Sequence, residues 1–145
     1  MYYINWDQVH SRLDFIPAIQ QVCETIIESP NQGNLSATEH FAQERALHLA
    51  IETVTDVGSL LIDGFIMRDA SSYEDIIEIL KGEQVFSEDI AFILLELVRL
   101  RRPLVQEYMD LERKGVHPLL PKIRETLPSF TESVKAFIKK ELKQE

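Results

Sequence analysis

The side chains best suited to hold a charged substrate are concentrated between residues 99 and 114. The stretch reads Arg101-Arg102-Pro103-Leu104-Val105-Gln106-Glu107-Tyr108, with Arg99, Arg113 and Lys114 on either side. It is the densest group of positive charges in the chain, and guanidinium groups bind phosphate oxygens in paired hydrogen bonds. If RNA binds to this protein, we expect its phosphates to lie here.

Arg101 also has a structural interpretation. On a continuous helix it falls in line with Leu94, Leu97 and Val105, and a charge on such an apolar seam must be paired or used. The spacing alone favours an Arg101 that extends to solvent or pairs with a carboxylate of a neighbouring helix.

A second candidate is a polar strip with a spacing of four residues, formed by Glu44, His48, Glu52 and Asp56. Carboxylate-bridged metal sites in helical bundles use Glu-x-x-His pairs from facing helices, and the sequence contains no such pair. We interpret the strip as the solvated face of a helix, and we predict no metal ion and no cofactor. Cys23 falls on an apolar helix face, which is typical of a buried structural thiol.

The charge distribution argues against several partners. The formal net charge is −9, and the acids and bases of residues 76–145 balance, so the excess lies in residues 1–75. An acidic protein repels nucleic-acid backbones at long range, so we expect no DNA partner. Charged residues interrupt every long apolar stretch, and the first ten residues lack the features of a signal peptide. Both observations predict a cytoplasmic protein with no membrane partner.

The elements that must position these side chains are all expected to be helical. Apolar residues recur every three or four positions, and Ser36, Ser72 and Ser87 are typical helix caps. We expect helices over about 5–29, 36–65, 72–82, 87–115 and 118–142. Prolines inside three of these ranges are expected to bend or interrupt the helix: Pro17, Pro103 and Pro128. The prediction is an all-α, up-and-down helical bundle of four long helices plus one short helix, in one domain over residues 1–145.

The stretch around Arg101 resembles the Arg-Asn-x-Leu-Val-His-x-Tyr motif of HepT-like proteins in the HEPN superfamily. Arg101 matches the motif arginine, Leu104 and Val105 match the apolar pair, and Tyr108 matches the tyrosine. Further segments resemble the YutE-like branch of this family: residues 43–48, 56–58, 61–69 and 72–76. The resemblance covers nearly the whole chain, and the expected helices fit the helical bundle of that family.

The resemblance implies a homodimer that is the toxin component of a toxin–antitoxin system, with a minimal nucleotidyltransferase as its antitoxin. It implies a ribonuclease that cleaves RNA without a metal. In that reaction the motif histidine takes the proton of a ribose 2′-OH, and the motif arginine stabilises the charge of the phosphorane. It also implies that the partner attaches AMP to the motif tyrosine, which is Tyr108 here.

Two substitutions fall at the centre of the motif. Gln106 stands where the motif has histidine, and Arg102 stands where it has asparagine, directly before Pro103. A glutamine has no titrating proton near neutral pH, so it cannot act as a general base, although it can orient RNA by hydrogen bonding. We therefore expect weakened RNA cleavage. The candidate residues are Arg101 and Gln106 for catalysis, Arg101 and Arg102 for RNA binding, and Tyr108 for nucleotidylation.

Alternatives to a weakened toxin remain open. One is a catalytically inactive dimeric interaction module that binds a minimal nucleotidyltransferase, and another is an unrelated bundle with a structural role. His40, His48 or His117 can in principle replace the missing base, but the sequence places none of them near Arg101.

Overall fold

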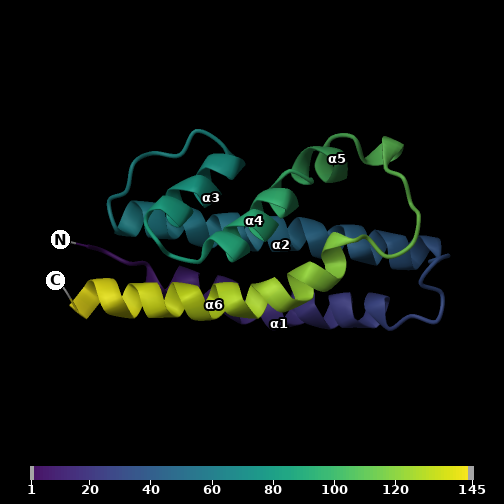
Figure 1. Cartoon of the computed structure of the whole chain (residues 1–145), viewed down its shortest axis with the longest axis horizontal. Coiled ribbons are helices and arrows are strands. Elements are labelled where there is room, and N and C mark those ends of the chain that lie inside the picture. Colours follow the sequence, from purple (N-terminus) through teal and green to yellow (C-terminus); the bar gives the residue numbers. More distant parts are fainter. Residues whose placement is uncertain (1, 144–145) are drawn as a thin grey trace.

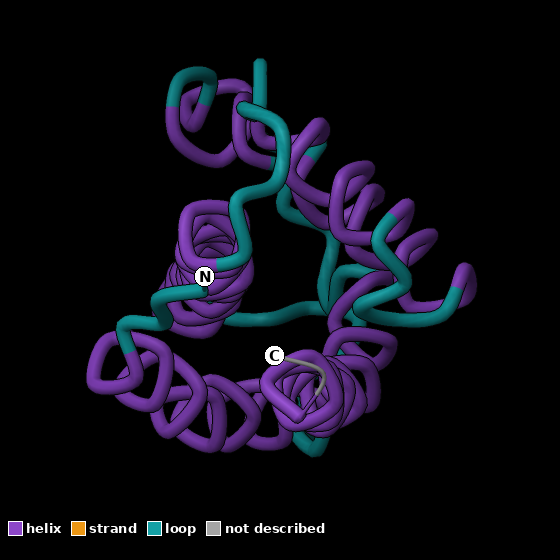
Figure 2. Tube along the Cα trace, turned by 90° about the vertical axis from the view of Figure 1, so that its left-hand side faces the viewer, coloured by secondary structure: helices purple, strands orange, loops and turns teal. Residues whose placement is uncertain are grey.

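The computed structural model describes residues 2–143. The elements follow in the order α1 (Trp6–Ile27), α2 (Ala37–Gly64), α3 (Tyr73–Gly82), α4 (Glu88–Val98), α5 (Arg101–Val105), the 3₁₀ turn η1 (Tyr108–Asp110) and α6 (Leu119–Lys143) (Figure 1). The described residues contain no strand (Figure 2), which confirms the predicted all-α helical bundle. Within the same residues, no helix combines the length and the apolar character needed to cross a membrane.

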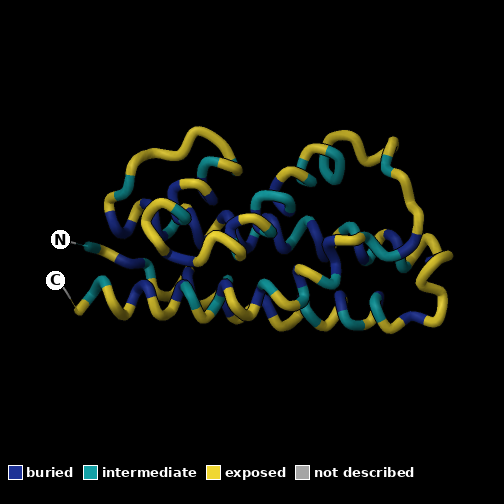
Figure 3. Tube along the Cα trace, in the orientation of Figure 1, coloured by how far each residue is buried: buried dark blue, intermediate teal, exposed yellow. Residues whose placement is uncertain are grey.

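The three long helices α1, α2 and α6 lie along the long axis of the molecule, and α1 runs antiparallel to the other two (Figure 1). Contacts join α1 to α2, α2 to α3, α3 to α4, α4 to α6 and α6 to α1, so these helices close a ring. The buried residues form one apolar core, and Figure 3 marks buried positions in dark blue along the trace. Its largest fully buried members include Ile16, Leu47, Leu61, Leu94, Leu120 and Phe130.

Three helices begin at the serine caps that the sequence predicts. The Ser36 hydroxyl accepts from the backbone N–H of Glu39 at 3.1 Å, and the Glu39 carboxylate accepts from the backbone N–H of Ser36 at 2.9 Å. Ser72 and Ser87 cap α3 and α4 in the same way, accepting from backbone N–H groups three residues later. Each cap satisfies an N–H group that would otherwise have no partner in the first helical turn.

The fourth predicted helix is divided. α4 ends at Val98, α5 spans only Arg101–Val105, and Tyr108 opens a separate 3₁₀ turn. Pro103 explains the position of the break. In a continuous helix it would lack the hydrogen bond to the Arg99 carbonyl, and its ring would clash with that carbonyl. Pro103 instead lies in the first turn of α5, where no backbone N–H is needed. Arg101 therefore lies on a separate short helix, and not on the apolar seam that a continuous helix would give it.

The prolines inside α1 and α6 do not end those helices. α1 continues through Pro17 and α6 continues through Pro128, so the predicted interruption at Pro128 is absent from α6. Leu127 and Phe130 flank this proline and are fully buried in the core. Such tertiary packing can hold a helix together across one missing backbone hydrogen bond.

Candidate functional site

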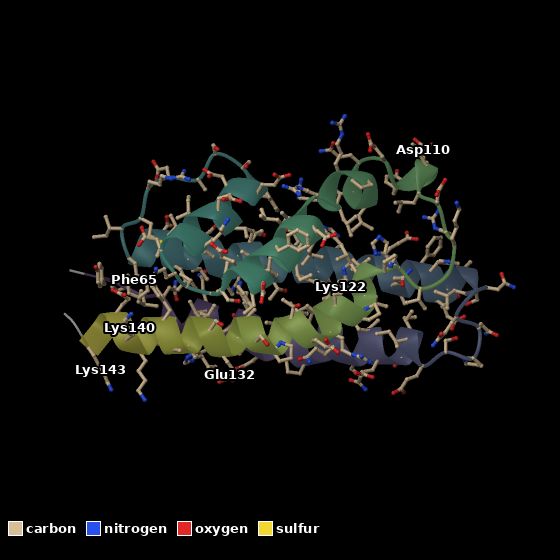
Figure 4. The ribbon with its side chains drawn as sticks, viewed as in Figure 1. Phe65, Asp110, Lys122, Glu132, Lys140 and Lys143 are labelled. Atoms are coloured by element: carbon tan, nitrogen blue, oxygen red, sulfur yellow. The ribbon has the colours of Figure 1, made fainter. Side chains whose placement is uncertain are left out.

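The segment between α4 and α6 is fastened to α2 at three points. Arg101 pairs with Glu52, and Arg113 makes two hydrogen bonds to Glu44 at 2.7 and 2.9 Å. The third point is Gly115, whose N–H donates to a ring nitrogen of His40 and whose carbonyl accepts from Gln43. Asp110 closes η1 at the outer edge of this segment, far from Lys140 and Lys143 near the other end of the bundle (Figure 4). Lys140 and Lys143 are therefore remote from the candidate site.

Arg101 lies where α2, α3 and α5 meet. Its Nε donates to Oε1 of Glu52 at 3.4 Å, and its guanidinium carbon lies 4.4 Å from the centre of the Tyr73 ring. The Tyr73 hydroxyl donates to the other oxygen of Glu52 at 3.5 Å. These contacts identify the carboxylate of a neighbouring helix that the structural interpretation requires. The Arg101 side chain remains 34% exposed, so part of its guanidinium can still bind a phosphate.

His48 lies beside the same carboxylate. Its Nε2 is 3.4 Å from Oε1 of Glu52, the oxygen that also accepts from Arg101. Its Nδ1 is 3.1 Å from a guanidinium nitrogen of Arg45. Because a guanidinium can only donate, Nδ1 is the accepting nitrogen, and in the neutral ring the proton belongs to Nε2. The side chains of His48 and Glu52 are 26% and 31% exposed, so both remain accessible to a ligand.

The polar strip of α2 is more than a solvated face. Glu44 pairs with Arg113, Glu52 pairs with Arg101, and Asp56 pairs with Arg12 of α1 at 3.4 Å. Within residues 2–143, no three of the histidine, cysteine, aspartate and glutamate side chains come together as a metal-binding group. The strip therefore serves as the surface on which arginines from other elements are positioned.

The other motif residues lie away from the Arg101 contacts. Arg102 pairs with Glu107 at 3.2 Å, and its side chain is 75% exposed. Gln106 follows the last residue of α5, is exposed, and its side chain has no hydrogen-bond partner among residues 2–143. Tyr108 opens η1 and is 54% exposed. Positions five apart on a helix point about 140° away from one another, so α5 does not bring Arg101 and Gln106 onto one face.

Each cation of the predicted basic patch has an acidic partner. Besides the three arginines already described, Arg99 lies 3.2 Å from Glu74, and Lys114 lies 3.1 Å from Glu112. The patch is therefore not an uncompensated positive surface in the free protein. The pairs of Arg99, Arg102 and Lys114 are exposed, and such pairs contribute only about 0–1 kcal/mol, so a phosphate can replace their carboxylates at little cost in free energy.

Two further side chains are structural. Cys23 is fully buried, and this burial raises the pKa of its thiol to about 11, so the thiol is not a nucleophile at neutral pH. Burial also lowers the pKa of His117, whose Nδ1 accepts from the backbone N–H of Leu119 at 3.0 Å. The backbone N–H of His117 donates to Gln43 at 2.8 Å, which fixes the start of α6 against α2.

The sequence does not reveal the contacts of Arg101 with Glu52 and Tyr73, or those of His48 with Arg45 and Glu52. It offers His48 only as one of three histidines that can in principle replace the base. Two features of the sequence together point to these contacts. Arg101 needs an acidic partner, and the helix that becomes α2 carries a single polar strip on an otherwise apolar surface. Either feature alone is common, and the identity of the partner depends on how α5 is packed against α2. Tyr73 gave no signal of its own, because an aromatic residue in the first turn of a helix is ordinary.

The family profile described as "Ribonuclease HepT-like" matches residues 15–136. The chain therefore belongs to the HepT-like ribonuclease family, as the resemblance of its motif indicates. The Bacillus subtilis (strain 168) protein YutE, whose name describes it as a candidate RNase, is 37% identical over 101 residues, which is 70% of each chain.

Two solved structures show the same fold. The structure of YutE from Bacillus subtilis, described as a cytosolic protein of unknown function, matches with a TM-score of 0.86 and 30% identity, covering 98% of this chain and 96% of YutE. The tri-AMPylated HEPN toxin of Shewanella oneidensis, in complex with the MNT antitoxin, matches with a TM-score of 0.76 and 15% identity. That match covers 90% of this chain and 98% of the toxin, and at this identity it shows the fold alone.

Proposed function

We propose that this chain is the RNA-cleaving toxin of a toxin–antitoxin system, with a site centred on Arg101. The observation that carries the proposal is how the Arg101 side chain is held in place. Its guanidinium is held between Glu52 and the Tyr73 ring, yet about a third of its side chain is open to solvent. Membership of a ribonuclease family supports an RNA substrate. A fixed, accessible guanidinium is suited to hold a phosphate while its charge increases.

The proposed reaction is attack of a ribose 2′-OH on the adjacent phosphate. Arg101 stabilises the added negative charge of the phosphorane, and Arg102 exchanges its exposed pairing with Glu107 for a neighbouring phosphate. Gln106 orients the RNA by hydrogen bonding but takes no proton. General acid–base catalysis contributes about 10²–10⁴-fold to such reactions, so we expect slow cleavage compared with a site that has the motif histidine.

The proposed partners are a second copy of this chain and a minimal nucleotidyltransferase antitoxin. Support for the antitoxin comes from the fold match to the Shewanella oneidensis toxin, which is itself AMPylated and bound to an antitoxin. Tyr108 is the proposed acceptor, because it is the motif tyrosine and its side chain is 54% exposed in the short turn after α5. In this modification the phenol oxygen bonds to the α-phosphorus of ATP, and pyrophosphate leaves with loss of the phenol proton.

Two observations favour the inactive interaction module as a second candidate. The position of the motif histidine carries Gln106, and every cation of the basic patch is paired in the free protein. Such a protein would dimerise and bind the nucleotidyltransferase without cleaving RNA.

Expression of the chain alone in bacterial cells separates the two functions. The toxin proposal predicts slowed growth and cleaved cellular RNA with the wild type and with Arg124→Ala, which removes an arginine–glutamate pair outside the basic patch. It predicts normal growth with Arg101→Ala. Normal growth with all three proteins, together with a stable complex with a minimal nucleotidyltransferase, would favour the interaction module instead.

A further inference from the structure

We propose that His48 is the general base of this site and occupies, from α2, the role that Gln106 cannot perform on α5. The inference rests on the proposed RNA cleavage and names the group that removes the 2′-OH proton. In this proposal the active site is formed by Arg101 together with the polar strip of α2, and not by the motif residues 101–108 alone.

The first observation is that His48 and Arg101 converge on one oxygen. Nε2 of His48 and Nε of Arg101 each lie 3.4 Å from Oε1 of Glu52. Nε2 of His48 and Nε of Arg101 are therefore no further apart than the sum of these two distances, and Nδ1, the proposed base, belongs to the same imidazole ring on the side that contacts Arg45. A ribose 2′-OH and the phosphate that it attacks are close neighbours, because the attack forms a five-membered ring. One nucleotide can thus meet both groups.

The second observation is the protonation pattern around the imidazole. Arg45 donates to Nδ1, which leaves the ring proton on Nε2, facing the Glu52 carboxylate. A general base needs one nitrogen with a lone pair and gains from a carboxylate at the other nitrogen, which orients the ring and stabilises the imidazolium. His48 has both features. The charged and titratable groups arranged around it are Arg45 and Glu52 on α2, Tyr73 from α3 and Arg101 from α5.

The third observation concerns Arg45. This arginine is exposed, and among residues 2–143 no carboxylate forms an ion pair with it. Its charge is therefore uncompensated, in contrast to the cations of the basic patch. When an RNA phosphate arrives, Arg45 can bind the phosphate and leave Nδ1 of His48 to the 2′-OH. The positive charge thus lies beside the base and not around Gln106.

The other three histidines are already engaged in different places. His40 bridges the Gly115 N–H and the Ser36 carbonyl and is buried, so it has no nitrogen free for substrate. His117 accepts from the N–H of Leu119 at the start of α6. His10 lies on α1, where its ring contacts Trp6 at a tilted angle. Of the four histidines, all within the described residues, His48 is the one whose carboxylate neighbour also binds Arg101.

The chemical step balances without another reactant. Nδ1 of His48 takes the 2′-OH proton while O2′ bonds to phosphorus, and the bond between phosphorus and O5′ breaks. O5′ takes a proton from water, which gives a 5′-OH end and a 2′,3′-cyclic phosphate. The imidazolium then returns its proton to the hydroxide left in solution, and the site is restored.

The test is single-turnover cleavage of a fluorogenic RNA by the full chain, with wild type, His48→Gln, Arg101→Ala and the matched control His10→Gln. We expect His48→Gln to lower the rate at least tenfold, to the level of Arg101→Ala, while His10→Gln cleaves as the wild type does. His48→Ala should regain cleavage when imidazole is added, because free imidazole replaces a base but not a structural contact. Circular dichroism checks that each variant keeps its helical content, and His48→Asn replaces any variant that fails to fold.

The outcomes distinguish this inference from the function on which it rests. If the wild type cleaves, Arg101→Ala does not, and His48→Gln matches the wild type, the role of His48 is overturned and the ribonuclease function stands. Loss of cleavage in His48→Ala without rescue by imidazole would also overturn the role as base. If the wild type and Arg101→Ala do not differ, both the ribonuclease function and the role of His48 are wrong.

Discussion

Arg101 on α5 and Glu52 on α2 are joined by a hydrogen bond of 3.4 Å between Nε and Oε1, across 49 residues of sequence. Because of this pair, the polar strip of α2 forms one side of the candidate site instead of facing only solvent. It also gives a partly buried guanidinium the partner it requires, because a buried charge without one is strongly destabilising. The short helix α5 is thereby held in a fixed orientation over α2.

Gly115 should be the glycine most sensitive to substitution. Its φ of +89° lies in the left-handed region, and an added Cβ would clash with the Gln32 carbonyl oxygen, while the neighbouring Val116 N–H donates to that oxygen at 3.1 Å. We expect Gly115→Ala to lower the free energy of unfolding by about 2 kcal/mol or more, from backbone strain and from the displaced loop. Urea unfolding followed by circular dichroism measures the change.

Gly33→Ala is the matched control for this prediction, because an added Cβ there meets no atom within 4 Å. Equal stability of the two variants would show that the segment before α6 is not held against α2 and the 31–34 loop as described.

His117 should make the stability depend on pH. Burial lowers its pKa in the folded protein below the ordinary value of 6.5. Between the folded and the unfolded pKa the unfolded chain binds more protons, so the free energy of unfolding falls as the pH is lowered through this window. The contribution of His117 to the free energy of unfolding is fully present above pH 6.5, and it is lost as the pH falls towards the pKa of His117 in the folded protein. We expect the wild type to lose more stability than His117→Asn between pH 7.5 and about 5.

Urea unfolding at both pH values checks this difference. Carboxylates with lowered pKa values, such as Glu39 and Asp75, are common to both proteins, so their acid dependence cancels in the comparison. A parallel loss of stability in the two proteins would contradict the assignment to His117.

The sequence was sufficient for the fold because its signals are local. The caps at Ser36, Ser72 and Ser87 and the apolar periodicity define where α2, α3 and α4 begin. The sequence places the interruption at Pro103, but α4 already ends at Val98. The reason is that the proline affects the carbonyl four residues earlier, at Arg99, to which its missing N–H would donate. That effect is local too, and it follows from the same hydrogen-bond pattern that defines the helix.

The site was predictable only in part. The motif identifies Arg101, Gln106 and Tyr108 by resemblance, and their roles remain proposals. Glu52 and His48 were assigned to a solvated strip, because helical periodicity records which residues share a face but not which element covers it. Only the packing of α5 and α3 on α2 places the His48 imidazole and the Arg101 guanidinium on the same oxygen.

Gln106→His should raise RNA cleavage. A neutral imidazole can take the 2′-OH proton and a carboxamide cannot, and acid–base assistance contributes about 10²–10⁴-fold. If no other side chain takes this proton, the increase is at least tenfold in a fluorogenic RNA assay, and it is absent when Arg101→Ala is present in the same chain. With His48 as the base, a second imidazole at position 106 adds less than tenfold. Unchanged cleavage, or strong cleavage by the wild type, would show that Gln106 is not the limiting deficiency, and the second result would agree with a base supplied by His48.

The protein should be a dimer at micromolar concentration. Arg101 and Gln106 point to different sides of α5, so two copies facing one another offer a simpler way to complete one site. Phe15 and Val22 also line an apolar groove between α1 and α2 that the single chain leaves uncovered. Light scattering should give twice the chain mass of 16.8 kDa. A monomer at this concentration would contradict the prediction.

The most direct test of the account is the dependence of RNA cleavage on Arg101. Purified wild type, Arg101→Ala and Arg124→Ala are compared on one RNA substrate under identical conditions. Arg124 also pairs with a glutamate, Glu24, at 3.4 Å, its side chain is 29% exposed against 34% for Arg101, and it lies outside the basic patch. The account predicts slow cleavage by the wild type and Arg124→Ala, and cleavage at the buffer level by Arg101→Ala. Equal rates in all three proteins, or loss of cleavage in Arg124→Ala alone, would contradict it.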